Sequence, residues 1–196
     1  LSLHDALPIW NTAQAEIAAL TRERIMNAAL ALLQDQWIDQ ITLEMVAKRA
    51  QVTVQTVLRH FGSKESLLVA AGRVANERAI DSREEVVIGD LSGAANNLSD
   101  HYEAVGDRVV RLLAQEERYP QLQSLLQQGR VKHREWVERV FAPYLSRRTD
   151  DDQERLLAQL IALCDVYTWK LVRRDAGLSQ EQYKVALTEL LSALLG

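Results

Sequence analysis

Residues that break helices are scarce in this chain, and this scarcity limits the folds that it can adopt. Its 196 residues include only eight glycines and three prolines. Long stretches without such breakers favour helices over many short strands joined by turns. No segment alternates between apolar and polar residues for long enough to predict a sheet. No run of 18 apolar residues predicts a membrane-spanning helix. We therefore expect an all-α protein that does not enter a membrane.

Apolar residues recur at helical spacing and divide the chain into segments. The pattern predicts helices over residues 21–36, 43–50, 53–61, 63–82, 93–117, 120–129, 137–145, 153–175 and 179–195. Short hydroxyl residues that can cap a helix N-terminus precede or open five of them, namely Thr21, Thr42, Thr53, Ser63 and Ser179. The helical period is lost between residues 84 and 92, so the chain is expected to change domain near there.

Two short predicted helices, residues 43–50 and 53–61, are separated by a break of a few residues. Such a pair is typical of a helix-turn-helix, in which the second helix presents its first turn to the major groove of DNA. Thr42 and Thr53 stand at the two N-termini, where hydroxyls and free N–H groups can hold phosphates. Spacing alone leaves open a generic capped helical hairpin.

The side chains of the second helix suit this interpretation. Gln55 and Thr56 lie in its first turn, where base edges would be, and Gln can pair with adenine through two hydrogen bonds. Arg59, His60 and Lys64 follow at positions suited to phosphates. Residues 21–80 hold eight Lys/Arg and six Asp/Glu, a net charge of +2, whereas the whole chain carries −4. A polyanion would therefore bind in this early part of the chain.

A sequence resemblance strengthens this expectation. The segment TRERIMNAALALLQDQWIDQITLEMVAKRAQVTVQTVLRHFGSKESLL, residues 21–68, resembles the N-terminal domain of TetR/AcrR-family repressors without a gap. The string His60-Phe61-Gly62-Ser63-Lys64-Glu65 is its most specific part. The rest of the chain has the length and helix-only pattern of that family's ligand-binding and dimerisation domain. The resemblance therefore implies a transcriptional regulator, a ligand-released repressor that binds a palindromic operator as a dimer.

The resemblance also assigns roles to residues. It implies phosphate contacts at Thr42, Thr53, Thr56, His60 and Lys64, and it implies that Val54, Gln55 and Arg59 occupy positions that vary with operator sequence. Three residues depart from the family pattern. Gln36 and Gln51 stand where Gly is frequent, and a positive φ at either would cost about 1 kcal/mol relative to Gly. Leu58 replaces a frequent Tyr and offers DNA an apolar group instead of a hydroxyl.

These inferences divide the chain into three parts. We interpret residues 1–13 as an artefact of cloning or sequence assembly, or as a disordered arm. Residues 14–63 are expected to form an N-terminal three-helix helix-turn-helix domain, and residues 64–196 a C-terminal helical bundle that binds an effector and dimerises. A helix over residues 64–82 would link the two and act as the lever between them.

The C-terminal part offers candidate residues for an effector and for a dimer interface. A small, largely apolar effector would lie among aromatic side chains with a few polar ones. These are Tyr102, Trp136, Phe141, Tyr144, Tyr167 and Trp169, with His101, His133 and Arg134 for polarity. The last two predicted helices are too apolar for one small chain to bury, which predicts a homodimer through a four-helix interface. Their apolar residues are Leu156, Leu157, Leu160, Ile161, Cys164, Tyr167, Leu171, Tyr183, Leu187, Leu190, Leu191 and Leu194.

Other classes of protein have less support. The sequence has no glycine-rich phosphate loop, nucleophile elbow or cluster at metal-ligand spacing, so we expect no enzyme, cofactor or metal. Cys164 is the only cysteine, which excludes an internal disulfide and suits the cytoplasm. A helical-bundle hydrolase or lyase, and an adaptor that binds proteins with the same helices, remain the alternatives.

Overall fold

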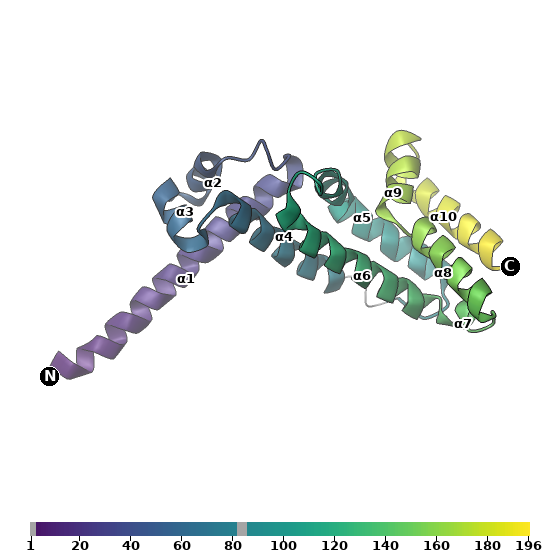
Figure 1. Cartoon of the computed structure of the whole chain (residues 1–196), viewed down its shortest axis with the longest axis horizontal. Coiled ribbons are helices and arrows are strands. Elements are labelled where there is room, and N and C mark those ends of the chain that lie inside the picture. The colour runs from purple at the N-terminus through teal and green to yellow at the C-terminus, as the bar shows by residue number, and fades with distance from the viewer. Residues whose placement is uncertain (1–2, 82–85) are drawn as a thin grey trace. The chain divides into compact units, whose positions relative to one another are not determined.

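The structure is a computed structural model that describes residues 3–81 and 86–196, with side chains over residues 14–75 and 86–196. Every element in the described part of the chain is helical (Figure 1), which confirms the all-α prediction. The helices pack as two compact units, residues 1–73 and 74–196. The division falls inside the fourth helix, after Arg73, whereas the two boundaries predicted from the sequence lie after residue 63 and within residues 84–92. None of the described helices is long and apolar enough to cross a membrane.

Unit 1 contains α1 (Leu3–Asp35), α2 (Leu43–Ala50), α3 (Val54–Phe61) and the start of α4 (Lys64–Asp81). The apolar face of α1 supplies one side of its core, as its helical spacing predicted, and α2 to α4 supply the other. The side chains at the centre are less than a tenth exposed: Ile25, Ala28, Ala29, Leu32, Leu33, Ile41, Val46, Ala47, Ala50, Val57, Leu67, Leu68 and Ala71. This core fixes α2 and α3 against one long helix.

The first helix begins earlier than the sequence predicted. We expected Thr21 to cap it, but α1 begins at Leu3, and the Thr21 hydroxyl donates to the carbonyl of Ile17, one turn earlier, at 2.8 Å. The segment 14–20, QAEIAAL, consists mostly of strong helix formers and contains no breaker, so nothing stops the helix before Thr21. The helix includes residues 3–13, whose foreign origin stays a prediction.

Unit 2 is built on α5 (Leu91–Leu113), which is capped by the Asp90 carboxylate and packs against α9 and α10. It continues through the 3₁₀ turn η1 (Pro120–Leu122), α6 (Gln123–Val140), α7 (Ala142–Leu145), α8 (Asp150–Leu163), α9 (Val166–Trp169), the π-helical turn η2 (Lys170–Asp175) and α10 (Gln180–Leu195). Pro120 opens its turn as predicted. Ser179 and Gln182 form a capping box that begins α10.

One predicted break in unit 2 was misplaced, and one break was not predicted. The helix expected to end near Gly129 continues as α6 to Val140, and the interruption falls at Phe141. A Cβ at Gly129 would meet nothing within 4 Å, so this glycine marks neither a turn nor a close approach.

The helix expected over residues 153–175 is divided at Cys164 and Asp165. The Tyr102 hydroxyl donates to the carbonyl of Cys164 at 2.9 Å, and the Asp165 carboxylate accepts the backbone N–H of Tyr167 at 2.8 Å. One bond occupies a carbonyl at the end of α8 and the other caps a new helix, so α9 starts separately. Helix α9 packs beside α5 close to Gly106, where a Cβ would lie 2.5 Å from Cζ3 of Trp169.

Candidate nucleic-acid interface

The turn between α2 and α3 has the geometry of a Schellman motif. Gln51 adopts φ 54° and ψ 48°, the left-handed conformation, and it is the only non-glycine residue with positive φ in the described chain. Its N–H donates to the carbonyl of Lys48 at 3.3 Å, and that of Val52 donates to Ala47 at 3.0 Å. The strain expected at Gln51 is therefore present, and the strain expected at Gln36 is absent.

Both helices begin at the threonines predicted to cap them. Thr42 Oγ1 accepts the N–H of Met45 at 3.3 Å, and Thr53 Oγ1 accepts that of Thr56 at 3.1 Å. The hydroxyls of Thr53 and Thr56 also lie 2.9 Å apart. Each cap satisfies only one of the free N–H groups at its helix end, so others remain available to an anion at α3, whereas at α2 the Glu44 carboxylate accepts its own N–H.

Helix α3 buries only Val57 among its eight residues. The side chains of Gln55, Leu58 and Arg59 are exposed, while Val54, Thr56 and His60 are partly buried. The helix thus uses one side chain to hold itself to the core and leaves the predicted base-facing and phosphate-facing positions accessible. Leu58 is 39% exposed, which fits the expected apolar contact with DNA better than a place in the core.

Three cations fix the helix-turn-helix by bonding to backbone carbonyls. Arg24 Nη2 donates to Ala50 O at 2.6 Å, at the turn itself. Arg22 Nη1 donates to His60 O at 2.8 Å, and its guanidinium lies 4.2 Å from the centroid of the half-buried Phe61 ring. Sequence analysis missed both arginines, because their partners lie 26 and 38 residues away.

Lys64 has a different geometry from the one the sequence suggested. Its ammonium donates to the carbonyls of Ile38 at 3.2 Å and Ile41 at 3.0 Å, just before the Thr42 cap. An ammonium has three donors, so one N–H is left for a phosphate. The phosphate contact at Lys64 therefore stays a prediction, alongside a structural role that the structure adds.

The carboxylate of Glu44 lies at the N-terminus of α2, where it repels an anion. Hydrogen bonds from its own backbone N–H and from the Thr42 side chain hold the pKa of Glu44 below its usual value. Glu44 lies in the first turn of α2, where its negative charge interacts favourably with the helix dipole. It stabilises α2 and repels phosphate at the same end.

The candidate effector residues of unit 2 are mostly packed into its core. Tyr102, Trp136, Phe141 and Trp169 are at most 5% exposed and belong to one apolar cluster. His133 is also buried, with Nε2 lying 3.2 Å from Ile161 O, and the Tyr144 hydroxyl donates to Gly89 O at 3.1 Å. Tyr167 is 48% exposed and lies outside this cluster. The structure therefore brings most of these residues together without showing an effector cavity among them.

A groove of about 560 Å³ lies elsewhere in unit 2, along α6, α7 and α8. Of the predicted polar residues it includes only Arg134, which is paired with Glu138 at 2.9 Å. Its other lining residues are Ala142, Leu145, Ser146, Asp150, Gln153, Glu154 and Leu157. None of the predicted aromatic residues lines it.

Comparison with known proteins identifies the helix-turn-helix. Residues 25–71 match the model of a family described as bacterial regulatory proteins, tetR family. The HTH-type transcriptional regulator YjdC of Escherichia coli K12 is 30% identical over 90 residues, 46% of this chain and 47% of YjdC. UidR of the same strain, also an HTH-type transcriptional regulator, is 29% identical over 123 residues, 60% of this chain and 62% of UidR. The helix-turn-helix part of this chain is therefore similar to that of the tetR family of bacterial regulatory proteins.

The matches span 47% of the length of YjdC and 62% of that of UidR. A solved structure of a transcriptional regulator from Rhodococcus sp. Rha1 matches over 89% of this chain and 95% of its own, with a TM-score of 0.71 and 20% identity. That likeness supports the TetR-like arrangement of an N-terminal helix-turn-helix and a C-terminal helical domain. The curated relatives are regulators and not enzymes.

Proposed function

We propose that this protein, as a member of the TetR family, binds a palindromic DNA operator as a homodimer and regulates transcription, acting as a repressor that a small ligand releases. The observation that carries the proposal is the accessibility of α3, which buries Val57 alone and is fixed at both ends by caps and by cation-to-carbonyl bonds. A helix held this way can meet base edges without further folding. The cytoplasm, where bacterial DNA lies, is the expected place of action.

Selection of bound duplexes from a random-sequence pool tests the DNA interaction. We expect one palindromic sequence whose half-sites lie about 34 Å apart or at a related helical spacing. Fluorescence anisotropy with that duplex is expected to show affinity that falls steeply as salt rises, because phosphate contacts release counterions. Binding without sequence preference, or none, would support the adaptor alternative.

Variants on α3 separate base contacts from phosphate contacts. Gln55→Ala is expected to cost about 1–3 kcal/mol of binding free energy and to relax preference at one base pair. His60→Ala is expected to weaken binding to all sequences alike. Gln128→Ala, an exposed glutamine on α6, is the matched control and is expected to change neither. A Gln55→Ala protein that selects the unchanged operator would contradict the base-reading role.

Dimerisation through the C-terminal helices is supported by apolar side chains that unit 2 leaves exposed. Seven of the residues expected at this interface are less than a tenth exposed within one chain: Leu156, Leu157, Leu160, Cys164, Tyr183, Leu187 and Leu191. Four large apolar side chains remain exposed on α9, η2 and α10, namely Tyr167 at 48%, Leu171 at 60%, Val185 at 58% and Leu190 at 44%. A partner copy would cover these four.

Sedimentation tests this interface. We expect a dimer for the unaltered chain and a monomer for Val185→Glu combined with Leu190→Glu, because two carboxylates would have to be buried. Val131→Glu, on α6 and also exposed, is the control and is expected to stay dimeric. A dimer that survives the double change would place the interface elsewhere.

Ligand release would operate through α4, because the division between the units falls inside this helix. A ligand that favours one conformation of unit 2 would shift the spacing of the two recognition helices in the dimer. The aromatic residues Tyr102, Trp136, Phe141 and Trp169 are packed into the core of unit 2, so a ligand that lies among them has to open this packing. If a ligand that saturates unit 2 leaves operator affinity unchanged, this release mechanism is wrong.

A further inference from the structure

Arg108, in the second half of α5, is buried without an acidic or hydrogen-bonding partner in the part of the chain that the structure describes. Only 7% of its surface is exposed. Burial, and then the nearby positive charge of Arg111, lower the pKa of its guanidinium. Arginine nevertheless keeps its proton in proteins, so the side chain is a cation that is largely, but not wholly, removed from water and lies beside a second cation.

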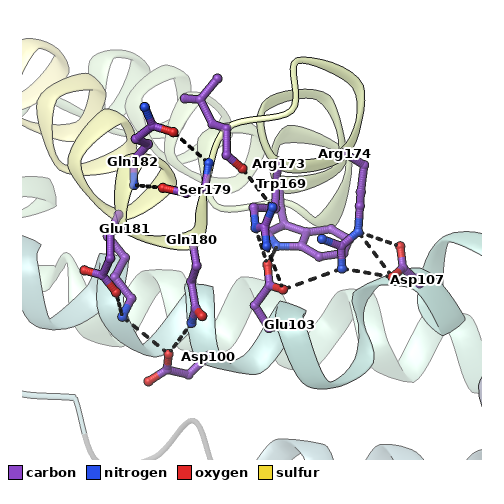
Figure 2. Close-up of polar contacts among 12 residues, drawn as sticks. Asp100, Glu103, Asp107, Trp169, Arg173, Arg174, Ser179, Gln180, Glu181 and Gln182 are labelled. Atoms are coloured by element: carbon purple, nitrogen blue, oxygen red, sulfur yellow. Dashed lines mark hydrogen bonds and ion pairs between the residues drawn. The ribbon is translucent and has the colours of Figure 1, made fainter.

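The acidic side chains of α5, unlike Arg108, have partners. Figure 2 shows three acidic residues of α5 bonded to arginines and polar groups of α9, η2 and α10. Glu103 accepts from Arg173 at 2.8 Å and from the Trp169 indole at 3.2 Å, while Asp107 accepts from Arg174 at 3.0 Å. Asp100 accepts from Gln180 at 2.8 Å. This helix therefore pairs its charges on the face turned to η2 and α10.

Arg108 follows Asp107 directly and so lies about 100° from it around the helix axis. Helical spacing places it on one stripe of α5 with His101, Val105 and Leu112, and Gln115 follows in the turn after the helix. Leu112 and Gln115 are buried, and His101 and Val105 are partly buried. Arg111, three residues after Arg108, lies on the same side of the helix, so the stripe combines two cations with apolar and hydrogen-bonding side chains. None of the residues at these spacings is acidic.

A largely buried guanidinium without an acidic partner lowers the stability of the folded protein. A buried charge that lacks a partner is unfavourable, and replacing it by an apolar side chain of similar size commonly stabilises a protein. A guanidinium held in place against this cost is typical of a site whose counter-charge arrives with a ligand, since Arg binds carboxylates and phosphates through two parallel hydrogen bonds.

We propose that Arg108 binds the anionic group of the effector, and that the effector is an organic acid whose apolar body lies along the same stripe of α5. This inference rests on the proposed function, in which unit 2 takes a small ligand. It changes the expected ligand from a largely apolar molecule to an amphipathic anion. Arg111 contributes a second positive charge to the same site.

The first test needs no ligand. Arg108→Met keeps the length of the side chain and removes its charge, so the Tm of the free protein is expected to rise by about 2–4 °C. Arg155→Met, on α8 with a side chain 67% exposed, is the matched control and is expected to shift Tm by less than about 1 °C. A clear fall in Tm for Arg108→Met would show that the charge is structural and would overturn the proposal.

The second test uses defined anions at constant ionic strength. Sodium benzoate, sodium butyrate and sodium phosphate are compared with sodium chloride and with uncharged benzamide by thermal unfolding. We expect benzoate or butyrate to raise the Tm of the unaltered chain by about 2 °C or more, benzamide to have no effect, and Arg108→Met to abolish the shift. Arg108→Lys keeps the charge without the planar fork and is expected to reduce the shift.

The outcomes distinguish an organic anion from an inorganic one. They also distinguish failure of the anion site from failure of the proposed DNA-binding function. Stabilisation by phosphate alone would keep the anion site and assign it to an inorganic or phosphorylated ligand. No stabilisation by any of the three anions, or equal stabilisation of Arg108→Met, would overturn the site. Operator binding by Arg108→Met without added anion is expected to equal that of the unaltered chain. If the unaltered chain selects no DNA, the proposed function fails, whatever the anions do.

Discussion

The two units use their cations differently. In unit 1, Arg22, Arg24 and Lys64 donate to backbone carbonyls, at distances from 2.6 to 3.2 Å. In unit 2, Arg130, Arg173 and Arg174 pair with carboxylates at 3.0 Å or less, and Arg173 also donates to the carbonyl of Leu178 at 2.8 Å. Both arrangements hold distant segments together, but only the second neutralises the charge.

This difference matches the partners proposed for the two units. A carbonyl orders a cation and leaves its net charge in place, so the helix-turn-helix can be rigid and positive at the same time. A carboxylate orders the cation and cancels its field, which suits a unit that meets no polyanion. Arg108 stands apart from both patterns, since the described chain gives it neither kind of partner.

The largest expected effect is a loss of stability on replacing Trp169, which lies among the bonds that join Glu103 and Arg174. Trp169 is fully buried, donates to Glu103 at 3.2 Å and lies 4.5 Å from the Arg174 guanidinium. Trp169→Ala is expected to lower the free energy of unfolding by about 3–5 kcal/mol, measured by urea denaturation. Tyr167→Ala, two residues earlier and 48% exposed, is the control and is expected to cost much less. Similar losses for the two would mean that packing in unit 2 does not depend on this network.

A smaller effect, with a different readout, is expected from Arg24→Met. Losing the bond to Ala50 O is expected to cost about 1 kcal/mol of stability, and operator affinity is expected to fall as well, because the turn loosens and a positive charge disappears. Arg174→Met is the matched change in unit 2 and is expected to leave operator affinity unchanged in anisotropy titrations. Equal losses of affinity for the two would break the contrast between the units.

The two units also differ in how far their structure could be predicted from the sequence. The helix-turn-helix was predicted almost to the residue, because its boundaries are marked by nearby residues: Thr42, Thr53 and the turn at Gln51 act within five positions of themselves. The division of the long C-terminal helix at Cys164 could not be predicted in this way, since the Tyr102 hydroxyl that bonds there is 62 residues distant. Gly129 misled the prediction, because a glycine at an open helix position looks the same in sequence as one that ends a helix.

The candidate sites follow the same rule. The exposed positions on α3 could be read from helical spacing, whereas the roles of Arg22 and Arg24 depend on tertiary contacts. In unit 2, helical spacing identified aromatic residues such as Tyr102 and Trp169, and the structure packs these two into the core with ring centroids 6.0 Å apart. The sequence could not distinguish a core aromatic from a ligand-lining one, nor reveal that Arg108 is buried.

Gln51→Gly tests whether the positive φ of Gln51, in the turn between α2 and α3 of unit 1, lowers stability. Gln51 adopts φ 54°, which a glycine reaches without the clash of a Cβ. The substitution is expected to raise the free energy of unfolding by up to about 1 kcal/mol and to leave the selected operator sequence unchanged. Gln36→Gly is the control and is expected to destabilise, because Gln36 does not have a positive φ. A loss of stability with Gln51→Gly would mean that contacts of the glutamine side chain outweigh the strain.

The smallest effect concerns how the units respond to acid. A hydrogen bond from Arg130, and then its charge, hold the pKa of Glu116 below its usual value of 4.5. A carboxyl whose pKa is lowered on folding stabilises the protein above its unfolded pKa, and that contribution is lost as pH falls through the folded pKa. The Arg24 bond to a carbonyl has no such dependence.

Glu116→Gln is therefore expected to have a lower Tm than the unaltered chain at pH 7, by an amount that shrinks as the pH falls below 4.5. Glu117→Gln removes the same charge from the neighbouring exposed position and is the control, with little difference expected at either pH. Thermal unfolding of the three proteins at several pH values measures the effect. A difference between Glu116→Gln and the unaltered chain that persists well below this range would mean that the pair acts through its geometry rather than its charge, and unit 2 would then resemble unit 1 in how it uses its cations.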